Sequence, residues 1–82
     1  MYHEEVIQIN YGALVFRIKE FGLTQAEVAQ KIGTTPTSFS LKINNRVQFQ
    51  QNEILKIAEL LELDMSEIGF YFFTRSVKKA QT

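Results

Sequence analysis

Apolar side chains recur at helical spacing near the start of the chain. Leu14, Ile18 and Phe21 fall at positions i, i+4 and i+7, so this segment has one apolar face. Asn10 is a favourable N-cap residue, and Gly22 suits the left-handed conformation that often ends a helix. The pattern predicts an amphipathic helix between these two residues.

Capping signals predict a second and a third helix. Thr24 and Glu27 have the spacing of a capping box, in which each side chain accepts a hydrogen bond from the other residue's backbone N–H. Gly33 then suits a positive φ at the end of the helix. Thr35 followed by Pro36 is typical of a helix start, because proline needs no N–H at the first helical position. Two short helices joined by such a turn are the signature of a helix-turn-helix.

The helix that starts at Pro36 has a distinct inner and outer face. Phe39 and Ile43 are spaced for a buried stripe. Asn44 and Asn45 are a reasonable end, because asparagine tolerates the left-handed conformation. At about 100° per residue, the side opposite the stripe carries Thr37, Ser40, Leu41 and Asn44.

Two more helices are predicted beyond this unit. Val47 and Phe49 are apolar anchors in a loop, and a fourth helix starts near Asn52. Asp64 and Glu67 resemble a second capping box, which opens a short fifth helix containing Met65 and Ile68. The expected inner face of the fourth helix consists of Ile54, Leu55, Ala58 and Leu61.

Both ends of the chain favour short strands. Residues 5–10 and 70–77 are rich in β-branched or aromatic side chains, and each is short enough for one strand. We expect either that the two segments pair with each other or that the C-terminal segment pairs with a second copy of the chain across a dimer. No repeat or linker divides the chain, so we expect one mainly α domain over 1–82, with its core in 11–74 and a tail at 75–82.

The distribution of charge is compatible with nucleic-acid binding, although the formal net charge is zero. Between residues 24 and 52 the basic residues Lys31, Lys42 and Arg46 stand against Glu27 alone, and the stretch that follows is strongly acidic. Such segregation can place a positive face on a neutral molecule, and a phosphate backbone responds to that local field. Ordinary solvated charge is the simpler alternative.

The composition argues against several kinds of site. There are no cysteines, and the single histidine, His3, lies in the N-terminal tail, so we expect no metal, no cofactor and no small-molecule ligand. No apolar run is long enough to cross a bilayer, and the start lacks the pattern of a secretory signal, so the expected location is the cytoplasm. No nucleophile is paired with a base, which argues against an enzyme.

Three stretches resemble a known family of transcriptional regulators. Leu23–Thr35 closely resembles the first half of the helix-turn-helix in phage repressors and the wider xenobiotic-response-element regulators. Leu55–Asp64 is similar to the fourth helix of that family, and Tyr71–Thr74 is similar to small Cro-like phage regulators. The resemblance implies a lambda-repressor-like bundle of four to five helices that binds double-stranded DNA.

The resemblance also implies a DNA-contacting surface. Gln25 matches a position that contacts phosphate, the start of the third helix enters the major groove, and the loop after that helix contacts the DNA backbone. Hydroxyl groups on the outer face add base contacts of low selectivity. The expected DNA-contacting residues are Gln25, Thr35, Pro36, Thr37, Ser38, Ser40, Leu41, Lys42, Asn44, Asn45 and Arg46.

Lys42 departs from the family pattern, which has an apolar residue at this position. Either the third helix is rotated so that Ile43 fills the core, or Lys42 lays its aliphatic stem along the core and carries its charge outward. The departure leaves open whether Leu41 contacts DNA or has a packing role.

Two functions from different classes fit these observations. The first is a sequence-specific, Cro-like repressor that binds an operator as a homodimer in a bacterial host, associated with the nucleoid when bound. The second is a protein-interaction module, such as an antitoxin or anti-repressor, built on the same fold. Four adjacent aromatics cannot all face one small interior, so a share of them is expected at a dimer contact. These are Phe70, Tyr71, Phe72 and Phe73.

Overall fold

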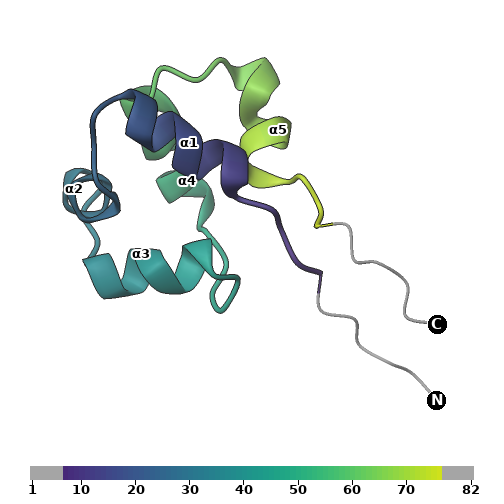
Figure 1. Ribbon diagram of the computed structural model, residues 1–82, viewed down its shortest axis with the longest axis horizontal. Coiled ribbons are helices and arrows are strands. Elements are labelled where there is room, and N and C mark those ends of the chain that lie inside the picture. Colours follow the sequence, from purple (N-terminus) through teal and green to yellow (C-terminus); the bar gives the residue numbers. More distant parts are fainter. Residues whose placement is uncertain (1–6, 77–82) are drawn as a thin grey trace.

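Five short α-helices surround one apolar core in the computed structural model, which describes residues 7–76 (Figure 1). In chain order they are α1 (Gly12–Glu20), α2 (Gln25–Lys31), α3 (Pro36–Ile43), α4 (Gln51–Leu60) and α5 (Ile68–Phe72), with the 3-10 helix η1 (Met65–Glu67) directly before α5. α2 packs chiefly against α3, and α1 packs against both α2 and α5. The predicted mainly α fold of four to five helices is confirmed.

Side-chain caps set where α2 and α3 begin. Thr24 Oγ1 accepts the Glu27 N–H at 3.1 Å, while Glu27 Oε1 accepts the Thr24 N–H at 2.8 Å. Thr35 Oγ1 accepts the Ser38 N–H at 3.1 Å. Between the helices Gly33 adopts a φ of 85°, which costs glycine less than other residues. The capping box, the glycine turn and the threonine cap are all where the sequence predicted them.

α1 begins slightly later than predicted. Tyr11 occupies the N-cap position, and Asn10 Oδ1 accepts the Gly12 N–H at 2.8 Å from the residue before it. Asn10 therefore still satisfies a free N–H at this end of the helix. Gly22 follows the helix at a φ of 72°, as the predicted stop requires.

An aromatic cluster around Phe49 packs on one side of the core. The Phe49 ring meets the rings of Tyr11, Phe39 and Phe72 edge to face, with centroids 5.4 to 5.7 Å apart. Such pairs contribute about 0.5–1.5 kcal/mol each beyond the area they bury. Phe49 therefore anchors the α3–α4 loop as predicted, whereas the prediction for Val47 is wrong because its side chain is exposed. The largest fully buried side chains are Phe39, Phe72, Leu14, Ile18, Ile57, Leu61 and Val28.

The face that α4 turns to the core includes Ile54, Ala58 and Leu61, as predicted, but not Leu55. Ile57 is fully buried and Glu53, one turn earlier, is also buried, while Leu55 is 45% exposed. Positions two apart lie on nearly opposite sides of a helix, so an inward Ile57 places Leu55 outward. The assignment of Leu55 to the inner face is wrong, whereas Ala58 and Leu61 are buried as predicted.

The C-terminal aromatic segment is helical where the sequence predicted a strand. Asp64 and Glu67 form the predicted capping box at the start of η1, and the chain stays helical through Phe72. Strand propensity depends strongly on context, and here packing of a helix-period stripe prevails over it. The residues of that stripe, which pack on the core, are Ile68, Tyr71 and Phe72.

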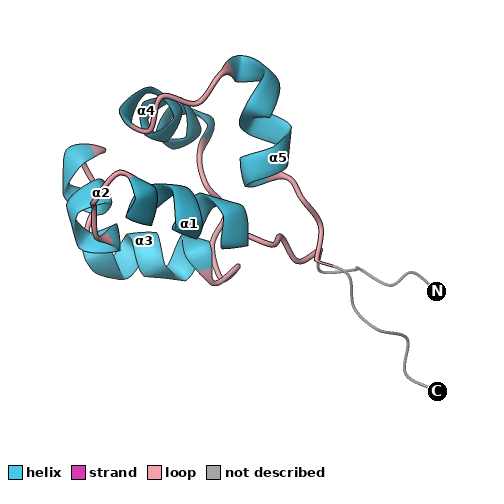
Figure 2. Ribbon diagram, turned by 45° about the horizontal axis from the view of Figure 1, so that its top comes forward, coloured by secondary structure: helices cyan, strands magenta, loops and turns pink. Residues whose placement is uncertain are grey.

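The two described ends run side by side and meet in one antiparallel bridge between Ile9 and Arg75 (Figure 2). Within residues 7–76 the predicted terminal strands are reduced to this bridge. Residues 5, 6 and 77 of these segments, most of the predicted tail and His3 lie outside the described residues. Two backbone hydrogen bonds flank the bridge, from Asn10 N–H to Thr74 C=O at 2.7 Å and from Ser76 N–H to Gln8 C=O at 2.9 Å.

Two glycine-to-alanine changes should have opposite effects. Gly33→Ala places a side chain at a φ of 85° and should lower the free energy of unfolding by about 1–2 kcal/mol. Gly69 lies inside α5, and no described atom lies within 4 Å of an added Cβ. Because glycine loses more conformational freedom in a helix than alanine does, Gly69→Ala should raise the free energy of unfolding by about 0.5–1 kcal/mol. Urea unfolding followed by circular dichroism measures both, and a shift of the same sign in both variants would contradict these backbone assignments.

Candidate functional site

The outer face of α3 is exposed and uncharged. α2 and α3 lie on the side of the molecule away from α5 (Figures 1 and 2). Phe39 is buried, which anchors the inner side of α3, and Leu41 on the other side is 40% exposed. Asn44 Nδ2 donates to the Ser40 C=O at 2.9 Å, so these two residues are linked on the surface. All four side chains predicted to point outward are exposed, namely Thr37, Ser40, Leu41 and Asn44.

The other predicted DNA contacts differ in exposure. Thr35 and Pro36 are exposed at the start of α3, and Arg46 is exposed in the loop after it. Gln25, at the start of α2, is half-buried, and so is Ser38. Their contact with DNA stays a prediction.

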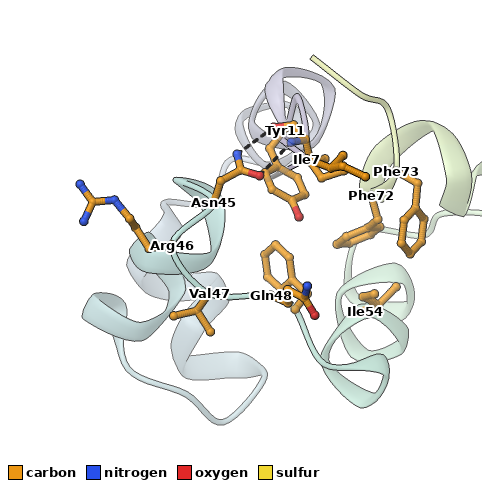
Figure 3. Close-up of a pocket in the computed structure, with 11 residues that line it drawn as sticks. Ile7, Tyr11, Asn45, Arg46, Val47, Gln48, Ile54, Phe72 and Phe73 are labelled. Carbon is orange, nitrogen blue, oxygen red and sulfur yellow. Dashed lines mark hydrogen bonds between the residues drawn. The ribbon is translucent and has the colours of Figure 1, made fainter. Parts of the chain in front are cut away.

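Asn45 is engaged inside the chain. Its Oδ1 accepts the Ile9 N–H at 2.8 Å, and its Nδ2 donates to the Ile9 C=O at 2.9 Å (Figure 3). Its backbone has a φ of 65°, in keeping with the predicted end of the helix. A DNA contact through this amide would compete with both hydrogen bonds.

Lys42, the only cation of α3, is buried. Its Nζ lies 2.5 Å from Oε2 of Glu53, and its side chain is 8% exposed. Neither predicted alternative is right: Ile43 is only half-buried, so α3 is not rotated to place it in the core, and the lysine charge points inward rather than outward. The physical reason is that Glu53 supplies the countercharge a buried ammonium needs. In this arrangement Lys42 is not accessible to DNA.

Glu53 joins α3 to the start of α4. Its Oε1 accepts the Gln50 N–H at 2.8 Å while its Oε2 binds Lys42. Burial by itself raises the pKa of Glu53. The hydrogen bonds from Lys42 and Gln50, together with the charges of Lys42 and Lys56, outweigh burial, and the pKa is lowered from its ordinary value. The carboxylate therefore stays ionised in the folded protein.

The predicted basic stretch is weaker on the surface than in the sequence. Once Glu53 neutralises Lys42, the exposed cations between residues 24 and 52 are Lys31 and Arg46, and Glu27 is also exposed. Only cations that reach phosphate release counterions and strengthen DNA binding. Pairing with Glu53 therefore removes one of the three expected contributors.

An apolar groove lies between the α3–α4 loop, α4 and the C-terminal segment. It consists of two cavities of about 550 and 440 Å³ that share Phe49, Ile54 and Phe73. Figure 3 shows the larger one. Tyr11 lines the larger cavity, and burial raises the pKa of its hydroxyl. Arg46 is the one charged residue among the described linings, and its side chain points away from the cavity. Within residues 7–76, five of the eight exposed large apolar side chains line the groove: Ile7, Val47, Leu55, Met65 and Phe73.

The four C-terminal aromatics divide between core and surface. Phe72 is 2% exposed and Tyr71 is half-buried, whereas Phe70 and Phe73 are 60% and 58% exposed. Phe70 packs edge to face on Tyr71, and Phe73 lines the apolar groove. The expectation that they cannot all face the interior is confirmed. Phe72 belongs to the core of its own chain, and a dimer contact through the exposed pair stays a prediction.

Comparison with known proteins places the chain in a family. The family described as "Protein of unknown function (DUF739)" matches residues 7–75. This chain belongs to the DUF739 family. The solution structure of the modulator of repression (MOR) of the temperate bacteriophage TP901-1 from Lactococcus lactis is also similar, with 36% identity and a TM-score of 0.70 over 80% of this chain and 89% of that chain. A search of curated proteins finds no match.

The similarity places this DUF739 protein among relatives of a phage regulatory protein. The predicted relationship to phage regulators is confirmed at that level, and the finer Cro-like assignment stays a prediction. Within residues 7–76, no three acidic, histidine or cysteine side chains gather as a metal site would require. None of the described helices is long and apolar enough to cross a membrane.

Sequence reasoning missed both the apolar groove and the buried acid. Leu55 was assigned to the core, and Glu53 was counted only as part of an acidic stretch. A usable signal was present, because Glu53, Ile57 and Leu61 are spaced four apart and share one helical face. Together with a lysine at an apolar position of α3, that spacing indicates an internal pair.

Breaking the ion pair from one side should be costly. Lys42→Met leaves the Glu53 carboxylate buried without its countercharge and should lower the free energy of unfolding by about 3 kcal/mol. Lys42→Met combined with Glu53→Gln removes both charges and keeps an acceptor for the Gln50 N–H, so it should recover at least half of that loss. Urea unfolding of the three proteins measures this, and a double variant no more stable than Lys42→Met would argue against the pair.

Stability should also depend on pH through Glu53. Because its pKa is lower in the folded than in the unfolded protein, its contribution is fully present above the unfolded value of about 4.5 and is lost as pH falls through the lower folded value. Between pH 7 and pH 3 the double variant should therefore lose less stability than the native chain. The check is the urea midpoint at both pH values, and parallel losses in the two proteins would contradict the assignment.

Proposed function

We propose that this protein modulates transcriptional repression in a phage-type regulatory circuit by binding a partner protein, the repressor, through its apolar groove. The exposed apolar side chains that line this groove carry the proposal, and the uncharged outer face of α3 supports it. The similar protein of phage TP901-1 is named a modulator of repression, which supports the same role for this chain.

The electrostatics of α3 favour a protein partner over DNA. Contacts between cations and phosphate supply essentially all non-specific DNA affinity and a large share of specific affinity. The single cation of α3 is buried against Glu53, and the exposed hydroxyl, amide and leucine side chains carry no charge. Such a face offers weak base contacts and little steering toward a polyanion.

The groove has the composition of a docking surface. Exposed apolar side chains are normal when scattered, but a contiguous patch with a polar rim indicates a binding site. Here Leu55, Met65 and Phe73 come together from α4, η1 and the end of α5. Arg46 stands at the rim and no acidic residue lines the groove among the described residues, so the complementary partner segment is apolar with a carboxylate at its edge.

Operator binding by the protein itself is the second candidate. It is supported by the exposed Thr37 and Ser40 on α3, and by helix N-termini whose free N–H groups favour phosphate. As a dimer the chain would then act as the predicted Cro-like repressor. The two candidates differ in their response to salt, because several phosphate contacts make affinity fall steeply as salt rises.

Variants at exposed apolar positions inside and outside the groove distinguish binding in the groove from a general effect of surface hydrophobicity. Leu55→Ser with Met65→Ser should weaken binding to the repressor of the same phage at least tenfold, because each side chain contributes about 1.5 kcal/mol or more when fully buried. Phe16→Ser removes an exposed aromatic that lines neither cavity, and it should change affinity less than twofold. Isothermal titration calorimetry measures both affinities.

A reporter under the phage operator provides the functional test. Co-expression of this protein should alter transcription only when the repressor is also present, and the groove variant should lose that effect. Two results together would contradict the proposal and support the second candidate. The first is that this protein alone binds the operator with an affinity that falls steeply as salt rises, and the second is that it alters reporter transcription equally with and without the repressor.

A further inference from the structure

The N-terminal segment at residues 7–10 forms one wall of the apolar groove. Ile7 and Ile9 line the larger cavity together with Ile54 and Phe73. Ile7 is 54% exposed and Ile9 is half-buried, so little apolar burial holds this wall in place. Directed hydrogen bonds must therefore contribute much of its attachment.

Those hydrogen bonds converge on Ile9 from two sides. Ile9 and Arg75 face each other as the pair between two flanking backbone bonds, which leaves the N–H and C=O of Ile9 pointing away from the C-terminal segment. Asn45 takes both groups with its side-chain amide, at 2.8 and 2.9 Å. The amide thus occupies the place of a peptide group in a third strand.

The position of Asn45 makes this contact a link between two parts of the molecule. Asn45 lies two residues after the end of α3, and its neighbours Arg46 and Val47 line the same cavity as Ile9. Figure 3 shows the amide aimed at the N-terminal segment while Arg46 points the other way. One side chain therefore connects the end of α3 to the wall of the groove.

We infer that residues 7–10 are a strap that closes one side of the groove, and that the Asn45 amide is its latch. With the latch made, residues 7–10 cover one side of the groove. With the latch released, the strap opens, and the aromatic rings of Phe49 and Tyr11, which line the same cavity, become accessible to an apolar ligand. Because a segment held by few buried contacts opens locally at small cost, the strap opens without unfolding the core. This device does not require the identity of the partner given above.

A pair of glycine substitutions isolates the latch. Asn45→Gly removes the amide at a left-handed position that glycine accepts, and Glu62→Gly is the matched control because Glu62 is exposed and also left-handed, at a φ of 57°. Amide hydrogen exchange should be at least tenfold faster at Ile9 and Asn10 in Asn45→Gly than in Glu62→Gly, with exchange at Ile57 unchanged. Asn45→Asp retains an acceptor for the Ile9 N–H and loses the donor, so it should fall between the two.

Access to the groove is measured with the apolar dye anilinonaphthalene sulfonate. Its fluorescence should rise at least twofold with Asn45→Gly relative to Glu62→Gly at a pH and temperature where circular dichroism shows both folded. Equal exchange at Ile9 in the two variants would overturn the latch, and faster exchange without a rise in dye fluorescence would overturn the gating of the groove. Neither readout involves a repressor or DNA, so failure here is separate from failure of the proposed function.

Discussion

The buried ion pair between Lys42 and Glu53 sets the phase of two helices at once. Because Lys42 points inward, the outer face of α3 has no cation. Because Glu53 points inward, Leu55, two positions further along α4, points outward into the groove. The ion pair thus leaves the outer face of α3 without a cation for DNA phosphate. It also accompanies the outward position of Leu55, which adds an apolar side chain to the groove.

The aromatic cluster around Phe49 connects these surfaces. Phe49 holds the α3–α4 loop against Tyr11, Phe39 and Phe72, and it also lines both cavities of the groove. A ligand in the groove therefore touches a ring that packs directly on α3. The contact between Asn45 and the N-terminal strap is a second connection between α3 and the same groove. Phe49 and Asn45 therefore each link the wall of the groove to α3 or to the loop that follows it.

Signals local in the sequence predicted where the helices lie better than which face of each helix is buried. The Thr24 capping box, the Gly33 turn and the Thr35–Pro36 start each depend on a few neighbouring residues, so the sequence alone located α2 and α3. The spacing of Glu53, Ile57 and Leu61 indicates that they share one face of α4, but the countercharge that lets Glu53 be buried is a lysine on another helix, so no pattern within α4 contains the pair itself. The aromatic segment at Phe70 was assigned to a strand from composition, although the preceding capping box and the i, i+3, i+4 stripe favoured a helix.

The candidate site shows the same division between local and long-range causes. The outward face of α3 followed from helical geometry, whereas the groove is assembled from segments distant in sequence. The most direct test of the central claim is chemical-shift mapping of the ¹⁵N-labelled protein titrated with the repressor proposed as its partner and, separately, with operator DNA. Repressor should perturb the backbone amides of Leu55, Met65 and Phe73, and DNA alone should leave the spectrum unchanged at physiological salt. Saturable shifts confined to Thr37, Ser40 and Leu41 on adding DNA alone would contradict it.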